Sequence, residues 1–277
     1  EDHLDCYQDL GDIYRAFRRF CGNISQNGFV VVNNDPRNCG CYVPETVKKI
    51  TFGFKPHNDF QITEARFQHP DNRFTLTGKS IRENFTVPFP GNHNILNAAA
   101  GAVLALELGL SVEHIQKELA NFSGVQRRFD ILYSAPDLIV LDDYAHHPTE
   151  VRATLAAARS HYGQRRIVAY VQPHTYSRTV ALLEQWPEAF AAADVVLIGA
   201  IYASREKDTQ GLYTHLATDL VERIAVRHPS VTYVGNIAAA TAAALQCLRP
   251  GDVLLTMGAG DGNLIGEAVL KKLQMER

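Results

Sequence analysis

The chain has 277 residues, of which 46% are hydrophobic, so it is long enough for two ordinary globular domains that each bury a core. Lys and Arg number 27 and Asp and Glu number 30, which gives a net charge of −3. This balance excludes a basic surface for nucleic acid or for an anionic membrane, and no apolar run has the length of a transmembrane segment. Any phosphate group must therefore be held locally, by a few cations and by helix N-termini.

The cysteines are odd in number and scattered, and nothing resembles a secretory signal, which predicts a reducing cytoplasm with free thiols. They are Cys6, Cys21, Cys39, Cys41 and Cys247. Cys39 and Cys41 lack a second Cys or His pair at zinc spacing. The chain starts at Glu1 without a methionine and enters a polar cluster at once, so we expect an N-terminal part to be missing.

The first half of the chain mixes helical and strand patterns. Apolar residues at helical spacing predict an amphipathic helix over residues 8–22, and a buried strand follows at 28–33. Short alternating segments between residues 50 and 87 predict an antiparallel patch, a small sheet beside the main one. Two alanine-rich or apolar helices, over 92–108 and 112–122, are expected to be buried, and a domain boundary is expected near residues 124–128.

From Phe129 onward strands and helices alternate, which is typical of βαβ units and predicts a mostly parallel, doubly wound sheet. The expected strands cover residues 139–142, 167–171, 195–198, 231–234 and 253–257. The expected helices cover residues 148–162, 178–192, 213–227, 237–248 and 264–274. The fold class is thus α/β, with part of a mixed-sheet domain followed by a Rossmann-like domain.

The densest cluster of reactive side chains lies between the strand at 139–142 and the helix that opens at Pro148. It contains Asp142, Asp143, Tyr144, His146 and His147. Such a loop lies at the carboxyl end of a strand, where open α/β sheets bind ligands. The structural alternative is that Asp143 or His147 only caps the helix.

A second loop of this kind follows the strand at 167–171, so it should lie on the same edge of the sheet. Arg178 would face a carboxylate or phosphate there, while His174 and Tyr176 would supply hydrogen bonds. A purely structural role for these side chains is the alternative.

Two further stretches contain groups suited to a nucleotide. His93, Asn94 and Asn97 lie at the start of a predicted helix, and a carboxamide offers a donor and an acceptor that suit the edge of adenine. The alternative is a helix cap with satisfied core polar groups. Arg127 and Arg128 form either a phosphate clamp at the domain boundary or a solvated surface pair.

The glycine-rich turn from Gly258 to Gly262 follows a strand and precedes a helix. Its last position is Asn263 where the dinucleotide fingerprint has glycine, and its strand comes last in the domain. We interpret it as a turn that can bind an anion and not as a nicotinamide site.

At the other end of the chain, His3 with nearby carboxylates is either a magnesium ligand or part of a frayed acidic terminus.

Taken together, these stretches resemble the Mur ligases, and they occur in the order found in that family. The matching segments are Asp2–Asp5, Gly91–Ala98, Gly124–Phe129, Asp142–Glu150, Gln172–Thr179 and Met257–Asp261. The Asp-Asp-Tyr-Ala-His-His-Pro run most resembles the branch that adds L-alanine to UDP-N-acetylmuramate. The resemblance implies that residues 1–124 are the latter part of a central ATPase domain and residues 125–277 a complete C-terminal domain. The phosphate loop and the uridine site would then lie upstream of Glu1, and this part alone should be inactive.

The reaction implied by the resemblance is ATP- and Mg²⁺-dependent amide formation in peptidoglycan precursor synthesis, through an acyl phosphate. By the same resemblance, His3 would bind a magnesium ion, His93, Asn94 and Asn97 would lie at the adenine, and Arg128 and Asp143 would contact the phosphates or ribose. Tyr144, His146, His174 and Arg178 would form the alanine pocket, with Arg178 pairing with the carboxylate and His146 as a candidate base. The expected partners are UDP-N-acetylmuramate and L-alanine, with no nucleic acid and no membrane insertion.

Two departures from the family pattern change these expectations. Many relatives have a second arginine where Thr175 stands, so the clamp should depend on Arg178 alone. Arg18 and Arg19 occupy the region where sister ligases carry a modified lysine, so no such modification is expected. The alternatives are a ligase that recycles a tripeptide onto UDP-muramic acid, a nucleotide-binding module without catalysis, and a nicotinamide dehydrogenase built on the Gly258–Gly262 turn.

Overall fold

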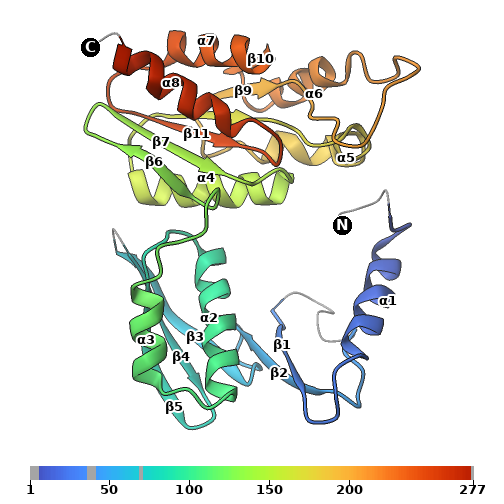
Figure 1. Cartoon of the computed structure of the whole chain (residues 1–277), viewed down its shortest axis with the longest axis vertical. Helices are drawn as coiled ribbons and strands as arrows, with labels where there is room; N and C mark the ends of the chain where they lie inside the picture. The colour runs from blue at the N-terminus through green and yellow to red at the C-terminus, as the bar shows by residue number, and fades with distance from the viewer. Residues whose placement is uncertain (1–5, 36–41, 69–70, 276–277) are drawn as a thin grey trace. The chain divides into compact units, whose positions relative to one another are not determined.

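The structure is a computed structural model that describes residues 6–35, 42–68 and 71–275. The chain divides into two compact units, with the boundary in the sequence between Ser123 and Gly124 (Figure 1). Each unit contains its own sheet and its own hydrophobic core. Among the described residues, no helix has the length and hydrophobicity needed to cross a membrane.

The first unit is built on one five-stranded sheet with the order β1-β2-β3-β4-β5. Its strands are β1 (Phe29–Asn33), β2 (Lys48–Gly53), β3 (Phe60–Gln68), β4 (Asp71–Gly78) and β5 (Ile81–Val87). The first three strands pair in parallel, and β3, β4 and β5 pair antiparallel. The antiparallel pairing predicted between residues 50 and 87 is present for β3, β4 and β5, whereas β2 pairs in parallel with both of its neighbours. These strands belong to one mixed sheet and not to a separate small sheet as predicted.

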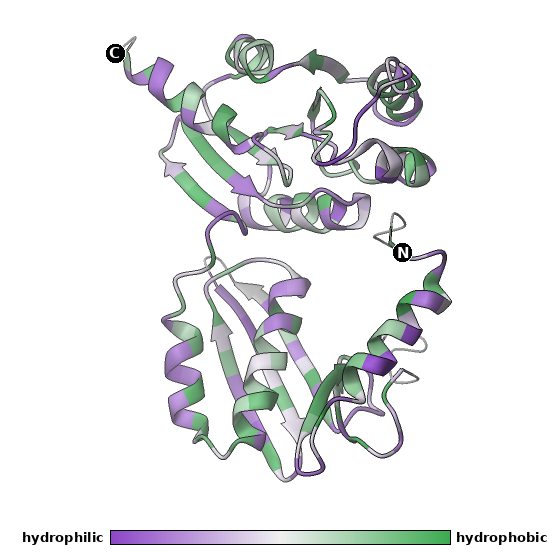
Figure 2. Ribbon diagram, turned by 45° about the vertical axis from the view of Figure 1, so that its right-hand side comes forward, coloured by the Kyte–Doolittle hydropathy of each residue, from purple (hydrophilic) through white to green (hydrophobic). Residues whose placement is uncertain are grey.

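Three helices accompany this sheet: α1 (Leu10–Cys21), α2 (Asn92–Glu107) and α3 (Val112–Ala120). Helix α2 buries Ile95, Ala99 and Val103 against the sheet, and this agrees with the burial expected for an alanine-rich helix. The expectation that α3 is also buried is wrong, because Ile115 is its only buried residue. Figure 2 shows hydrophilic residues along α3, which agrees with a helix that covers the sheet with one face.

Glu107 at the end of α2 connects the helix to two parts of the sheet. Its carboxylate pairs with Lys79 in the β4–β5 turn and lies 3.5 Å from Nζ of Lys48 in β2. The hydrogen bond from Lys79 is the main reason that the pKa of Glu107 is lowered from 4.5.

The second unit contains a six-stranded sheet with the order β10-β9-β8-β11-β7-β6. Its strands are β6 (Asp130–Ser134), β7 (Leu138–Asp143), β8 (Ile167–Val171), β9 (Val195–Gly199), β10 (Val231–Gly235) and β11 (Asp252–Met257). All pairs are parallel except β6 with β7. The five strands predicted in this half are confirmed, whereas the antiparallel edge strand β6 was not predicted.

The helices of this unit are α4 (Pro148–Tyr162), α5 (Tyr176–Ala181), α6 (Leu216–Ala225), α7 (Ile237–Cys247) and α8 (Asn263–Met275). Leu155 of α4 and Leu220 of α6 pack in the core on one face of the sheet, whereas Ala240 of α7 and Ile265 of α8 pack in the core on the other face. The sheet is therefore doubly wound, as predicted (Figure 1).

The single helix predicted over residues 178–192 is wrong. The chain forms the short helix α5, interrupts at Leu182, and continues as a 3-10 helix, η1 (Leu183–Glu188), which contains Pro187. Proline lacks the N–H group that an α-helix interior requires, so a continuous helix is disfavoured here.

Candidate functional site

Four loops of the second unit lie at the same edge of its sheet. They follow the parallel strands β9, β8, β11 and β7, which are neighbours in that order, so their carboxyl ends are adjacent. The helices after β7 and β8 include α4 and η1 on one face, whereas α8 after β11 packs on the other face. This change of face around β11 is the kind of position where open α/β sheets bind ligands.

Aromatic rings from three of these loops form one continuous row. The ring of His146 lies 5.5 Å from the ring of Tyr144 and 5.5 Å from the ring of His174. On the far side, His174 stacks on Tyr202 with 5.7 Å between ring centroids. The structure therefore brings together Tyr144, His146 and His174, and it adds Tyr202 from the loop after β9, which the sequence analysis missed.

The imidazole of His146 has its protonation pattern fixed by its own loop. Its Nδ1 atom lies 2.9 Å from the backbone oxygen of Tyr144, and a carbonyl oxygen can only accept, so Nδ1 carries a proton. In the neutral ring, Nε2 then holds the lone pair that can accept a proton from a substrate. The side chain is 14% exposed, so it is largely shielded from bulk water but still accessible from solvent.

His174 has the opposite pattern because of Arg178. Nη1 of Arg178 lies 3.0 Å from Nδ1 of His174, and a guanidinium group can only donate. Nδ1 of His174 therefore accepts, the ring is neutral, and its proton is on Nε2. His174 is thus suited to donate a hydrogen bond, whereas His146 is suited to accept a proton.

His147, next to His146, has a structural role. It is the N-cap of α4, where its Nδ1 accepts a hydrogen bond of 3.1 Å from the backbone N–H of Thr149. In return, the carboxylate of Glu150 accepts the N–H groups of His146 and His147. This reciprocal cap shows that His147 caps α4, as the structural alternative predicted, and it fixes the direction in which the chain enters α4.

Asp143 is buried, with 5% of its surface exposed, and its two carboxylate oxygens accept backbone N–H groups from Phe129 and Ala145, each at 2.8 Å. Burial raises the pKa of this carboxyl group, although the two hydrogen bonds act in the opposite direction. Phe129 has a φ of 49°, which is unusual for a bulky residue, so Asp143 holds a strained segment in place. The expected contact of Asp143 with ribose remains a prediction.

The neighbouring residues Arg127 and Arg128 differ in their hydrogen bonds and in their exposure to solvent. Nε of Arg127 donates to Asp142 over 3.0 Å, and its other nitrogens donate to the backbone oxygens of Gly260 at 3.1 Å and Gly258 at 2.6 Å. Arg127 is therefore engaged within the protein. Both guanidinium groups lie over the ring of Tyr144, at 5.1 Å for Arg127 and 5.2 Å for Arg128, but only Arg128 is exposed, so of the two it is the more accessible to a ligand.

The glycine-rich turn after β11 permits close contacts with the neighbouring loops. A Cβ atom at Gly260 would lie 2.4 Å from Oε1 of Gln172 and 2.6 Å from the ring of Tyr202. Gln172 in turn accepts the N–H of Gly262 and donates to Asp261 over 2.7 Å. Glycine is thus required here for packing against Gln172 and Tyr202.

The first unit carries the residues predicted to bind adenine. His93, Asn94 and Asn97 all lie on the first two turns of α2, which starts after Gly91. The carboxamide of Asn94 donates to the backbone oxygen of Pro90 over 2.8 Å, and Asn97 is exposed. Their predicted role is not tested by these contacts. His3, the predicted magnesium ligand, and the pair Cys39 and Cys41 lie outside the described residues.

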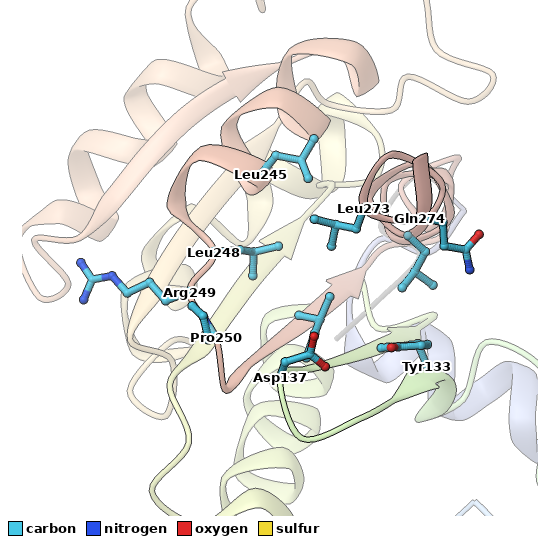
Figure 3. A pocket seen from close by; sticks show the side chains of 10 residues that line it. Tyr133, Asp137, Leu245, Leu248, Arg249, Pro250, Leu273 and Gln274 are labelled. Carbon is cyan, nitrogen blue, oxygen red and sulfur yellow. The ribbon is translucent and has the colours of Figure 1, made fainter. Parts of the chain in front are cut away.

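One pocket of about 290 Å³ lies at the other end of the strands of the second sheet, near the amino ends of β7 and β11 (Figure 3). Leucines from α7 and α8 line it, and the side chain of Asp137 points toward it while Arg249 points away. It contains none of the predicted site residues. Within the residues described, no group of three or more His, Cys, Asp or Glu side chains is arranged to hold a metal ion.

Comparison with known proteins agrees with this arrangement. The family model for the Mur ligase middle domain matches residues 1–105, and the model for the Mur ligase glutamate ligase domain matches residues 127–260. The UDP-N-acetylmuramate–L-alanine ligase of Roseiflexus castenholzii is 39% identical over 98% of this chain and 60% of its own length. The ligase of the same name from Syntrophotalea carbinolica is 38% identical over 99% of this chain and 59% of its own length.

A solved structure supports the fold. The UDP-N-acetylmuramate–alanine ligase of Thermotoga maritima superposes with a TM-score of 0.79 at 23% identity, and covers 100% of this chain and 58% of that protein. The chain thus spans about 60% of the length of the curated relatives that it matches. It belongs to the Mur ligase family, and its two parts match the models of the middle domain and of the glutamate ligase domain of that family.

Proposed function

We propose that this chain provides the amino-acid site and part of the ATP site of a ligase that joins L-alanine to UDP-N-acetylmuramate. The observation that supports this most strongly is the cluster of Tyr144, His146, His174 and Arg178 at adjacent strand ends. The names of the most similar curated relatives point to the same substrates. In this proposal, residues 1–124 belong to the central ATPase domain and residues 125–277 to the C-terminal domain.

The amino-acid pocket is proposed to work through a division of roles. Arg178 would pair with the carboxylate of alanine, because guanidinium and carboxylate groups form strong charge-assisted hydrogen bonds. His174 would donate from Nε2, and Tyr144 would close the pocket beside His146. The placement of Arg178 beside His174 at 3.0 Å favours a small amino acid that reaches both groups at once.

His146 is proposed as the base for the attacking amine. ATP would activate the muramic acid carboxylate as an acyl phosphate. The nitrogen of alanine then forms a bond to the acyl carbon, the bond from that carbon to the phosphate oxygen breaks, and the surplus proton of the amine moves to Nε2 of His146. The lone pair on Nε2 follows from the hydrogen bond between Nδ1 and Tyr144, at 2.9 Å.

Candidate contacts to ATP are proposed from the family resemblance. Asn94 and Asn97, with His93, would hold the adenine, and Arg128 and Asp143 would contact the phosphates or ribose. Helix α2 starts after a glycine and has no acidic residue in its first turn, which suits an anionic ligand nearby. Magnesium binding is proposed for His3.

The test is a ligation assay of the complete gene product with UDP-N-acetylmuramate, ATP and one of four amine substrates: alanine, serine, glycine or the tripeptide. The proposal predicts amide formation and phosphate release with alanine at the highest kcat/KM. Preference for the tripeptide would favour the recycling ligase. Nucleotide binding without any ligation would favour a non-catalytic module.

A further inference from the structure

The loop of residues 200–215, between β9 and α6, is bound closely to the segment that carries His174 and Arg178. The backbone N–H of Thr175 donates to the oxygen of Tyr202 over 2.8 Å, and the N–H of Tyr202 donates to the oxygen of Pro173 over 2.8 Å. Farther along both segments, Tyr176 stacks on Tyr213 with 4.8 Å between ring centroids. The loop therefore contacts this segment on both sides of Thr175.

Thr175 itself has a strained backbone. Its φ is 64° and its ψ is 146°, a region that is populated almost only by glycine. A β-branched residue persists in such a conformation only when the surrounding structure imposes it. The unusual turn at Thr175 redirects the chain between His174 and α5, so the position of the His174 ring relative to Arg178 depends on it.

Glu206 provides the contacts that hold this turn from its other side. Its Oε2 accepts the backbone N–H of Tyr176 at 2.6 Å and of Ser177 at 3.1 Å, and its Oε1 accepts the hydroxyl of Ser177. A carboxylate at this place is also favoured by the N–H groups exposed at the start of α5. Together with the oxygen of Tyr202, Glu206 binds three consecutive backbone N–H groups, those of residues 175 to 177.

We propose that Glu206 is a positioning residue that holds the strained turn at Thr175, and that Tyr202 supports the ring of His174 from one face. The two residues thereby fix the pair of His174 and Arg178 in the geometry observed. Neither residue touches the reacting atoms. The consequence for alanine binding rests on the function proposed above, whereas the effect on the turn does not.

The effect on the turn is tested in this chain by amide hydrogen exchange measured with NMR. In Glu206→Ala, the amides of Tyr176 and Ser177 should exchange at least tenfold faster, because they lose their acceptor. Glu184→Ala removes an exposed carboxylate of the same unit that pairs with Arg223, and it should leave both amides unchanged. Unchanged exchange at both amides in Glu206→Ala would overturn the proposal.

Folding of the variants is checked with the amides of the central strand β11, which should keep their protection. If Glu206→Ala fails to fold, Glu206→Gln replaces it, because the amide side chain keeps one acceptor oxygen and the same length. Both amides donate to Oε2, and a neutral amide oxygen is a weaker acceptor than a carboxylate, so we then expect the exchange of both amides to rise together by a smaller factor. Unchanged exchange at both would count equally against the proposal.

The effect on alanine is tested in the complete gene product by steady-state kinetics. Glu206→Ala should raise the KM for alanine about tenfold with the KM for ATP unchanged, and the control Glu184→Ala should keep both KM values of the wild type. If Arg178→Ala raises the alanine KM and Glu206→Ala does not, the positioning role is wrong. If neither variant changes the alanine KM, the proposed alanine pocket is wrong, which is a separate failure.

Discussion

The guanidinium group of Arg178 donates a hydrogen bond to Nδ1 of His174 over 3.0 Å, and this contact fixes the proton of His174 on Nε2. In the neighbouring His146, the contact between Nδ1 and the oxygen of Tyr144 fixes the proton on Nδ1. Two histidines whose rings are 5.5 Å apart therefore present opposite groups on their Nε2 atoms. This difference is the basis for assigning His146 as the base and His174 as a donor.

The opposite tautomers can be observed directly. Long-range ¹H–¹⁵N correlation spectra of the neutral rings should show a protonated Nδ1 in His146 and a protonated Nε2 in His174. In Arg178→Ala, the tautomer of His174 should become mixed, while His146 should keep its pattern. A protonated Nδ1 in neutral His174 of the wild-type protein would refute the assignment.

The two adjacent histidines should respond differently to substitution. His146→Gln should lower kcat of the complete gene product by about 10²- to 10⁴-fold, the usual contribution of a general base. His147→Gln removes the cap of α4, so it should destabilise the second unit by about 0.5–2 kcal/mol and leave kcat within a few-fold of wild type. Equal losses of kcat in both variants would remove the distinction between base and cap.

Substitutions of Arg127 and Arg128 should have different effects on the free energy of unfolding. Arg127→Ala leaves Asp142, which is 1% exposed, without its charged partner, and removing one partner of a buried pair costs about 3–5 kcal/mol. Arg128→Ala, at an exposed position, should change the free energy of unfolding by less than about 0.5 kcal/mol. Denaturant titrations of both variants make the comparison, and similar values for the two would contradict it.

The first unit should show a pH dependence that comes from Glu107. Since the pKa of Glu107 is lowered in the folded state, its ion pairs contribute stability above pH 4.5, and this contribution is lost as the pH falls through the lowered value. Glu107→Gln should therefore lower the free energy of unfolding by up to about 1 kcal/mol at pH 7, with the difference disappearing in acid. If the difference in free energy of unfolding between the wild type and Glu107→Gln grew as the pH fell, the pKa of Glu107 would be raised and not lowered on folding.

Much of the second unit could be predicted from the sequence because its signals are local. The apolar run that ends at Asp143, followed by Pro148 at the first position of a helix, predicts a strand, a loop and α4 at their observed places. Edge strand β6 was missed because its residues are mostly exposed and its pairing with β7 is antiparallel. The break at Leu182 was missed because the apolar pattern continues through Pro187.

The contacts that define the site were less predictable. Tyr202 and Glu206 reach His174 and α5 only because β9 lies next to β8, which the strand order decides. Arg127 and Arg128 look equivalent in the sequence. They differ because Arg127 pairs with Asp142 and also donates to backbone oxygens about 130 positions away, at Gly258 and Gly260. Partners so distant in the sequence cannot be recognised from a local sequence pattern. By contrast, the His, Tyr and Arg residues directly after the predicted strands did indicate where the site lies.

In the proposed alanine pocket, Arg178 is the group that would bind the carboxylate of the amino acid. The most direct measurement is the KM of the complete gene product for L-alanine and for ATP in Arg178→Ala, with Asn97→Ala as the reciprocal variant. We predict that Arg178→Ala raises the alanine KM about 10- to 100-fold with the ATP KM nearly unchanged, and that Asn97→Ala does the reverse. An alanine KM unchanged in Arg178→Ala would contradict the account.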